Sequence, residues 1–208
     1  MNMNDLNYVK IMRQCIQKVA TGPEYSKDLD FDEAHAAMRA ILSGEADDVQ
    51  IAIFLIALRM KRETNEENCG ILQGLLDTMN QVEAAVDEVV DICDPYDGYA
   101  RGVPASPFVP AVLAALGVNA VSHGLDFVGP KGGTTFHKVY KAAGLRVDLT
   151  PEEAAQQIVD IGWAYVDQAQ FAPKLHDMIP LRQRIIKRQV LTTVETMLGP
   201  IEVVRRLI

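Results

Sequence analysis

The chain has 208 residues, with 28 acidic against 20 basic side chains and a formal net charge of −8. Hydrophobic residues make up 49%, as in a globular protein with a sizeable core. No segment reaches the roughly 18 uncharged apolar residues that a membrane span needs, and the first ten residues lack a signal-peptide pattern. Three widely spaced cysteines indicate a reducing cytoplasm, and the acidic balance disfavours nucleic-acid binding.

The first 80 residues predict an all-helical domain. Apolar residues from Leu6 to Val19 recur at helical spacing, and Gly22 and Pro23 end that run. Asp30 with Glu33, and later Thr64 with Glu67, form capping-box patterns that open two further helices. The helix between these two is apolar on nearly every face over residues 51–58. Such a helix is buried in a core or an oligomer interface, so we expect a homodimer through this domain.

Residues 81–208 predict an α/β domain with a mainly parallel sheet, because strand-like and helical segments alternate. Strands are expected at residues 89–93, 118–121, 147–149 and 163–166. Helices are expected at residues 107–116, after the glycine-rich loop 129–133, from residue 151, and as a basic amphipathic helix over 181–198. The fold class is therefore α/β, with a helical domain at 1–80 followed by an incomplete parallel-sheet domain.

Residues 29–64 read LDFDEAHAAMRAILSGEADDVQIAIFLIALRMKRET, followed by VDICDPYDG at 90–98, SHG at 122–124, FAPKLH at 171–176 and an arginine-bearing segment from residue 181. This series resembles the anthranilate phosphoribosyltransferases and their relatives, glycosyltransferase family 3. The resemblance implies a homodimer joined through the helices. It also implies transfer of a 5-phosphoribosyl group from phosphoribosyl pyrophosphate to an aromatic amine, with Mg²⁺.

The resemblance assigns roles to eight residues of this chain. Those matching the family's phosphate-binding motifs are Ser106, Lys131 and Gly133. Those matching its substrate-binding motifs are His123, Gly124, His176, Arg182 and Arg188. The first arginine would contact the acceptor's carboxylate, because a planar guanidinium can pair both oxygens at once.

Two departures from the family pattern point to a divergent branch of the family and to a truncated chain. The glycine loop GTGGDG is replaced by DPYDGY at residues 94–99, where Asp94 and Asp97 would repel a pyrophosphate and Pro95 lacks an N–H. The chain is also far shorter than the family, so the carboxylates that hold Mg²⁺ are expected to be absent from it. No catalytic residue is assigned, and enzymatic activity stays open. The leading interpretation is a protein that performs, or descends from enzymes that perform, phosphoribosyl transfer to an aromatic amine.

The rival interpretation is a non-catalytic module of the divergent branch that binds a polyanion or nucleic acid. Its basic surface would consist of Arg182, Arg184, Lys187 and Arg188, although such a run is more often a solvated helix face.

Several candidate residues also have structural interpretations. His123 could be a loop histidine, His176 a helix cap, and Lys131 part of a plain strand-to-helix turn. His35 and His137 are expected to be solvated helix residues. Asp94 and Asp97 are expected to form a turn network with nearby polar groups.

Overall fold

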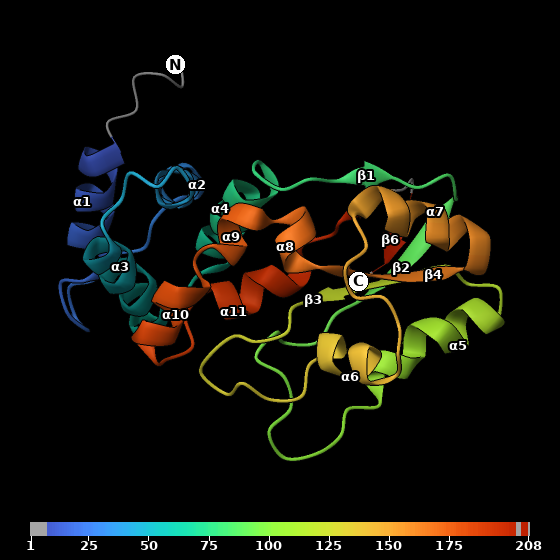
Figure 1. Cartoon of the computed structure of the whole chain (residues 1–208). Coiled ribbons are helices and arrows are strands. Elements are labelled where there is room, and N and C mark those ends of the chain that lie inside the picture. The colour runs from blue at the N-terminus through green and yellow to red at the C-terminus, as the bar shows by residue number, and fades with distance from the viewer. Residues whose placement is uncertain (1–7, 203–204, 208) are drawn as a thin grey trace. The chain divides into compact units, whose positions relative to one another are not determined.

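The computed structural model describes residues 8–202 and 205–207, and its contacts divide the chain into two compact units (Figure 1). One unit contains the described residues of Met1–Thr78 together with Pro180–Glu195, and the other contains those of Met79–Ile179 and Thr196–Ile208. The sequence boundary at residue 80 assigned 180–195 to the sheet domain, whereas this segment contacts the helical unit instead.

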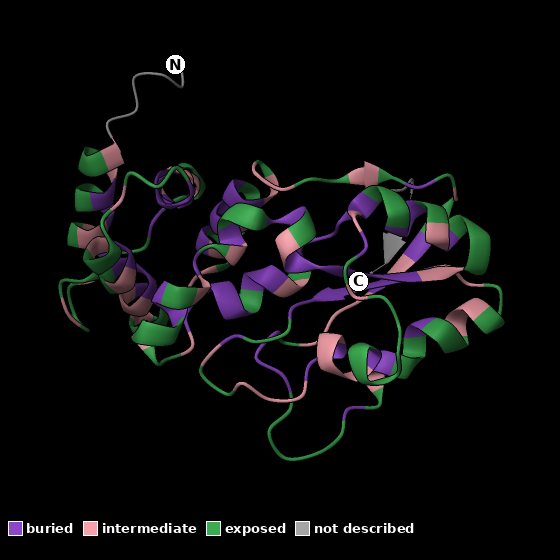
Figure 2. Ribbon diagram, in the orientation of Figure 1, coloured by how far each residue is buried: buried purple, intermediate pink, exposed green. Residues whose placement is uncertain are grey.

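The first unit is helical, as expected. Its helices are α1 (Tyr8–Val19), α2 (Phe31–Leu42), α3 (Asp48–Lys61), α4 (Asn65–Leu76), α10 (Ile179–Ile185) and α11 (Leu191–Val194). Both predicted capping boxes are present, Asp30 with Glu33 at α2 and Thr64 with Glu67 at α4. Leu6, which was expected to begin the first helix, lies outside the described residues. Buried and exposed positions alternate along these helices, as amphipathic packing requires (Figure 2).

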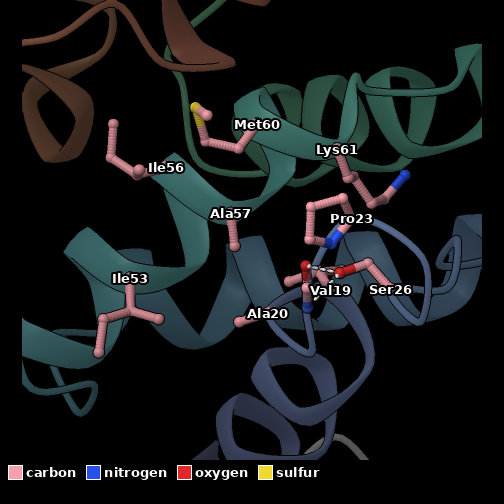
Figure 3. Close-up of a pocket in the computed structure, with 10 residues that line it drawn as sticks. Val19, Ala20, Pro23, Ser26, Ile53, Ile56, Ala57, Met60 and Lys61 are labelled. Atoms are coloured by element: carbon pink, nitrogen blue, oxygen red, sulfur yellow. Dashed lines mark hydrogen bonds between the residues drawn. The ribbon is translucent and has the colours of Figure 1, made fainter.

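Helix α3 buries only one of its apolar faces within this unit. Its inward residues are Ile51, Phe54, Leu55 and Leu58. Val49, Ile53 and Met60 are 62%, 44% and 78% exposed and follow the helical spacing of a single stripe. Beside this stripe lies an apolar pocket of about 410 Å³, lined by Ile53, Met60 and the end of α1 (Figure 3). The expectation that this helix is buried all round is therefore wrong for the described chain on its own.

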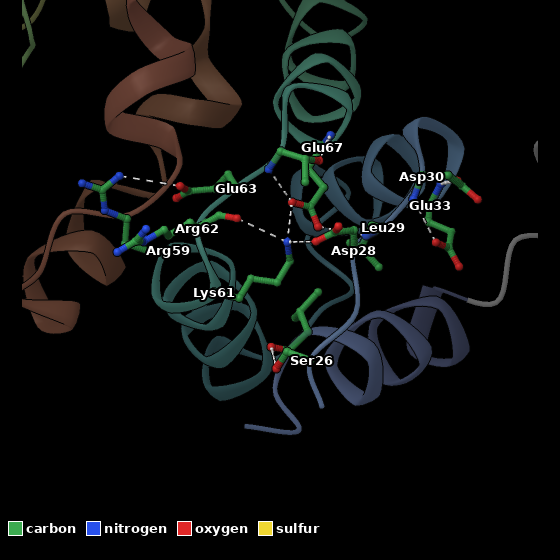
Figure 4. Close-up of polar contacts among 12 residues, drawn as sticks. Ser26, Asp28, Leu29, Asp30, Glu33, Arg59, Lys61, Arg62, Glu63 and Glu67 are labelled. Atoms are coloured by element: carbon green, nitrogen blue, oxygen red, sulfur yellow. Dashed lines mark hydrogen bonds and ion pairs between the residues drawn. The ribbon is translucent and has the colours of Figure 1, made fainter. Parts of the chain in front are cut away.

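A buried carboxylate joins three segments of the helical unit (Figure 4). The side chain of Glu67 is fully buried and accepts hydrogen bonds from the backbone N–H groups of Leu29 at 2.9 Å and Thr64 at 2.8 Å. Lys61 Nζ lies 2.8 Å from Glu67 and 2.6 Å from Asp28. Burial alone would lower the pKa of Lys61, but its hydrogen bonds to Asp28 and Glu67 outweigh that effect and raise it. This network fixes the α3–α4 turn to the segment before α2.

Helices α2 and α4 are in close contact because two glycines of α4 face α2. A Cβ placed on Gly70 would lie 2.4 Å from the carbonyl oxygen of Phe31 and 2.8 Å from the Cβ of Ala34. A Cβ on Gly74 would lie 2.8 Å from the Cβ of Met38. The approach of the two helices therefore leaves no room for a side chain at residue 70.

The second unit contains parallel strands, as the alternating pattern predicted. The order β4 (Trp163–Asp167), β3 (Ala120–Gly124), β2 (Glu88–Ile92), β6 (Arg205–Leu207) describes a four-stranded sheet. The strands β1 (Val82–Glu83) and β5 (Ile201–Glu202) pair separately. The register aligns Ile92 with Ser122, Ser122 with Tyr165 and Gly124 with Asp167. The carboxyl ends of β3 and β4 therefore lie at one edge.

The strand expected at residues 147–149 is absent, since residues 145–150 connect two helices without joining the sheet. The helices of this unit are α5 (Val109–Ala115), α6 (Phe136–Ala142), α7 (Pro151–Ile161), α8 (Gln168–Phe171) and α9 (Pro173–His176). In Figure 1, α5 and α6 lie below the sheet and α7 lies above it. Phe136 and Tyr140 of α6 pack with Tyr165 of β4 in a buried cluster. Side chains on that face of the sheet are thus covered by α6.

The prediction of a single basic helix over residues 181–198 is wrong. Helix α10 ends at Ile185, and Ile186 then adopts a φ of 66°, which interrupts helical backbone. The chain continues through α11 and the short 3₁₀ helix η3 (Glu195–Met197). Among all the helices that the structure describes, none is both long and apolar enough to cross a membrane.

Candidate functional site

Several of the predicted site residues converge on the turn formed by residues 94–99, which follows β2. Ser106, at the start of the 3₁₀ helix η2 (Ser106–Phe108), donates a short hydrogen bond from its hydroxyl to a carboxylate oxygen of Asp94. Lys131 Nζ lies 3.3 Å from Oδ1 of the buried Asp97 and donates to the carbonyl oxygen of Gly98 at 3.2 Å. Two of the three phosphate-binding candidates, Ser106 and Lys131, therefore contact the same turn, and carboxylates of the chain itself are their partners.

The glycine at residue 133 allows the loop before α6 to contact this turn. The N–H of Gly133 donates to the carbonyl oxygen of Asp97 at 2.8 Å, and Tyr99 and Thr134 exchange two backbone hydrogen bonds of 2.9 and 2.8 Å. A Cβ on Gly133 would lie 2.6 Å from the backbone of Tyr99. The backbone that the resemblance assigned to a phosphate is thus occupied by the turn.

The carboxyl edge beneath the turn has little open space. A pocket of about 10 Å³, roughly the room of one water molecule, is lined by the turn, by Gly124 and by residues 134–136. Helix α6 also contributes Tyr140, which donates from its hydroxyl to the carbonyl oxygen of Pro107 at 2.8 Å. Burial raises the pKa of Tyr140 to about 12; its hydrogen bond with Ser122 opposes this rise and the charge of Asp94 adds to it. The phenol therefore stays a neutral donor at this edge.

His123 also lines this small pocket and is almost fully buried. Its Nδ1 shares a short hydrogen bond with the hydroxyl of Tyr96, and its Nε2 lies 3.2 Å from Oδ1 of Asp91. Its ring contacts Phe171 edge to face at 5.5 Å. The imidazole of His123 is therefore closed to a substrate. It also differs from the alternative expectation, which was a loop histidine that hydrogen-bonds backbone atoms. Gly124 follows it as the last residue of β3 and lines the same pocket as the turn.

Arg182 is paired inside the helical unit. Its Nη1 and Nη2 lie 2.7 and 2.8 Å from the two carboxylate oxygens of Glu195, and both side chains are fully buried. In this arrangement Glu195 already occupies both of the guanidinium nitrogens to which an acceptor's carboxylate would bind. We therefore correct the expected role of Arg182 from substrate binding to a structural one. Arg184 pairs with Asp48 at 2.7 Å. Two of the four cations of the proposed polyanion surface thus have carboxylate partners.

The two remaining candidates lie apart from the turn along the chain. Arg188 is half-buried in the loop after Ile186, and His176 is the half-buried last residue of α9. The backbone N–H of His176 donates to the carbonyl oxygen of Ala172 at 3.0 Å, while its Nδ1 has no hydrogen-bond partner among the residues described.

One pair at the carboxyl edge was missed by the sequence analysis. His137, expected to be a solvated helix residue, lies with its Nδ1 2.7 Å from Oδ2 of Asp167, and their side chains are only 12% and 11% exposed. The position of Asp167 directly after a strand was a usable signal, because ligand-binding side chains gather there in parallel sheets. Its pairing with a histidine 30 residues earlier was not predictable from local pattern.

The described residues do not form a metal site by themselves. Within residues 8–202 and 205–207, no three His, Cys, Asp or Glu side chains are grouped closely enough to hold an ion.

Comparison with known proteins gives the class of the fold. A family model described as the glycosyl transferase family, helical bundle domain, matches residues 13–79. An anthranilate phosphoribosyltransferase from Saccharomyces cerevisiae, solved in complex with PRPP and Mg, has a similar fold. Its TM-score is 0.72 at 16% identity, over 95% of this chain and 58% of that one. The helical domain followed by a parallel α/β sheet is thus the architecture of these glycosyl transferases.

Sequence relatives define the family. The anthranilate phosphoribosyltransferase of Bacillus caldotenax is 33% identical over 191 residues, which cover 92% of this chain and 74% of the relative. That of Geobacillus kaustophilus is 33% identical over 191 residues, covering 92% of this chain and 53% of the relative. The chain belongs to the anthranilate phosphoribosyltransferase-like family, glycosyltransferase family 3. It spans about half the length of several of these relatives.

Proposed function

We propose that the protein is a phosphoribosyltransferase-like protein that holds a phosphoribosyl pyrophosphate-type anion at the carboxyl edge of its parallel sheet. The acceptor would be an aromatic amine, as in the relatives, or the protein would descend from enzymes with such an acceptor. The helical unit would serve as the dimerisation domain. We place the protein in the cytoplasm, because no disulfide joins its cysteines, Cys15, Cys69 and Cys93.

The convergence of Ser106, Lys131 and Gly133 on one turn is the observation that supports this function. A hydroxyl, an ammonium group and backbone N–H groups at the end of parallel strands are the groups that bind phosphates in such folds. The yeast relative was solved with PRPP and Mg, and its fold covers this sheet. In this chain Asp97 neutralises Lys131, so an incoming phosphate would have to displace a carboxylate.

The binding prediction follows from that competition. Replacing Asp97 with Asn removes the charge that competes for Lys131 and that repels the ligand. We expect affinity for phosphoribosyl pyrophosphate with Mg²⁺ to rise about tenfold, which corresponds to ~1.4 kcal/mol. Replacing Lys131 with Ala should weaken binding by a similar factor. Isothermal titration calorimetry of the three proteins measures both changes.

Asp160→Asn is the matched control, since it removes one negative charge from an exposed position on α7. It should leave the affinity within about twofold, because screening makes distant exposed charges weak. Unchanged binding in Lys131→Ala, or equal gains in Asp160→Asn and Asp97→Asn, would contradict the proposed anion site.

We also propose that the chain forms a homodimer through α3. The exposed stripe of Val49, Ile53 and Met60, with the apolar pocket beside it, is the kind of surface that a second copy covers in soluble oligomers. Replacing Ile53 with Asp would bury a charge in that interface. We expect the wild type to sediment as a dimer at micromolar concentration and Ile53→Asp as a monomer.

Val159 on α7 provides the control, because its side chain is 46% exposed and that of Ile53 is 44% exposed. Val159 belongs to the other unit, outside the proposed interface. Val159→Asp should remain dimeric in the same sedimentation-velocity experiment. A monomeric wild type would remove the dimer proposal, whatever the variants do.

A further inference from the structure

The turn at residues 94–99 is closed over the carboxyl edge of the sheet. The N–H of Gly98 donates to the carbonyl oxygen of Pro95 at 2.9 Å, which makes this segment a β-turn with Tyr96 and Asp97 as its central residues. The pocket that the turn lines holds about 10 Å³, roughly one water molecule. A phosphate group is too large for that space, so the turn has to move before a phosphate enters it.

Asp97 is the residue through which the turn closes the proposed anion site. Its side chain is fully buried, and its Oδ1 lies 3.3 Å from Nζ of Lys131. Its carbonyl oxygen accepts the N–H of Gly133 at 2.8 Å. One residue thus occupies both an ammonium group and a backbone N–H that the resemblance assigned to a phosphate. The apparent affinity for an anion therefore scales with the fraction of molecules in which Asp97 has left this position.

Tyr96, the residue before Asp97, anchors the turn to β3. Its hydroxyl shares a hydrogen bond with Nδ1 of His123, and the two residues are only 2% and 1% exposed. On the other side of the imidazole, Nε2 lies 3.2 Å from Oδ1 of Asp91. A carboxylate there favours the tautomer with its proton on Nε2, which leaves Nδ1 to accept from the phenol. The sheet thus holds Tyr96 in place, and with it the adjacent Asp97.

We propose that Tyr96 is a positioning residue, whose hydrogen bond to His123 acts as a latch that keeps Asp97 on Lys131 and so sets the anion affinity of this edge. Opening of the turn breaks this bond in addition to the contact between Asp97 and Lys131. The inference rests on the proposed function, because the latch regulates that same anion site. It needs no ligand at His123, whose imidazole stays in the core.

Tyr96→Phe removes the latch and keeps the ring that packs against Leu125 and Val128. We expect hydrogen exchange of the Gly133 amide in the full chain, followed by NMR, to become about fivefold faster, the factor that one lost neutral hydrogen bond corresponds to. The affinity for phosphoribosyl pyrophosphate with Mg²⁺, measured by calorimetry, should rise about as much, because it follows the open fraction.

Tyr165→Phe is the matched control. Tyr165 is also 2% exposed and lies on β4, outside the turn, and its hydroxyl has no hydrogen-bond partner among the residues described. The chemical change is the same, but no bond to the turn is lost. Exchange at Gly133 and the affinity should therefore both stay within about twofold of wild type.

The Asp97→Asn background separates a latch from a general structural role. Without the carboxylate, the closed turn has no charge to hold against Lys131. Tyr96→Phe should then change the affinity by less than about twofold, although exchange at Gly133 still rises. If Tyr96 supported the site only structurally, the same change in affinity would appear in both backgrounds.

Three results would overturn the inference: unchanged exchange at Gly133 in Tyr96→Phe, an equal change in Tyr165→Phe, or equal effects on affinity in the two backgrounds. If none of these proteins binds phosphoribosyl pyrophosphate, but exchange at Gly133 rises in Tyr96→Phe alone, the proposed function fails and the latch on the turn stands. If Lys131→Ala weakens binding and Tyr96→Phe changes neither measurement, the latch fails and the proposed function stands.

Discussion

Replacing Glu195 with Ala is expected to lower the free energy of unfolding by about 3–5 kcal/mol. The guanidinium of Arg182 is fully buried, and Glu195 pairs both of its terminal nitrogens. Removing the carboxylate leaves a charge in the core that water cannot reach. Urea denaturation followed by circular dichroism measures the change.

The exposed ion pair Arg184–Asp48 is the comparison, with side chains 69% and 53% exposed. Asp48→Ala should cost no more than about 1 kcal/mol, because solvent screens such pairs. The double variant Arg182→Met with Glu195→Leu should recover most of the lost stability, since apolar replacements of similar volume leave no orphaned charge. A loss below about 1 kcal/mol in Glu195→Ala would mean that the pair is not buried in solution.

Gly70→Ala should destabilise the helical unit by about 1–3 kcal/mol, the usual cost of overpacking. The expected sign is unusual, because alanine normally stabilises a helix interior by roughly 0.5–1 kcal/mol relative to glycine. Here the new methyl group would lie 2.4 Å from the carbonyl oxygen of Phe31, which belongs to backbone and cannot rotate away. Helices α2 and α4 would have to move apart, and thermal unfolding should report the loss.

Gly102→Ala is its control, since a Cβ there meets no atom within 4 Å and the residue is exposed. It should change the unfolding free energy by less than about 0.5 kcal/mol. A stabilised Gly70→Ala would indicate that α2 and α4 are farther apart than described.

Local patterns predicted most of the elements, because caps and apolar periods lie within one segment. The capping boxes at Asp30 and Thr64 and the strands near residues 120 and 163 are confirmed. The predicted strand at 147–149 was wrong, since a segment of three residues that includes Asp148 does not form a strand without a neighbour to pair with. The break at Ile186 was also missed, because a positive φ is rare at a β-branched residue and the local sequence gives no signal for it.

The candidate site was partly predictable. Ser106, Lys131 and Gly133 were selected by the resemblance, and they do converge on the turn 94–99. Asp94 and Asp97 were expected to form a turn network with nearby polar groups, but the particular partners, Ser106 and Lys131, lie in later segments that no local pattern joins to the turn. Side-chain pairs distant in sequence, such as Arg182 with Glu195, depend on how the chain returns on itself, which no local pattern specifies.

If Lys131 binds a phosphate as proposed, the ligand must replace the carboxylate of Asp97, which lies 3.3 Å from the ammonium group. At an open cationic site, dissolved salt competes with the ligand, so that affinity falls as ionic strength rises. Here the competing anion is tethered to the same chain at a fixed local concentration, 3.3 Å from the ammonium group. Added salt screens the tethered anion and the ligand alike. Ligand affinity at this edge should therefore be governed by the stability of the turn more than by the ionic strength of the solution.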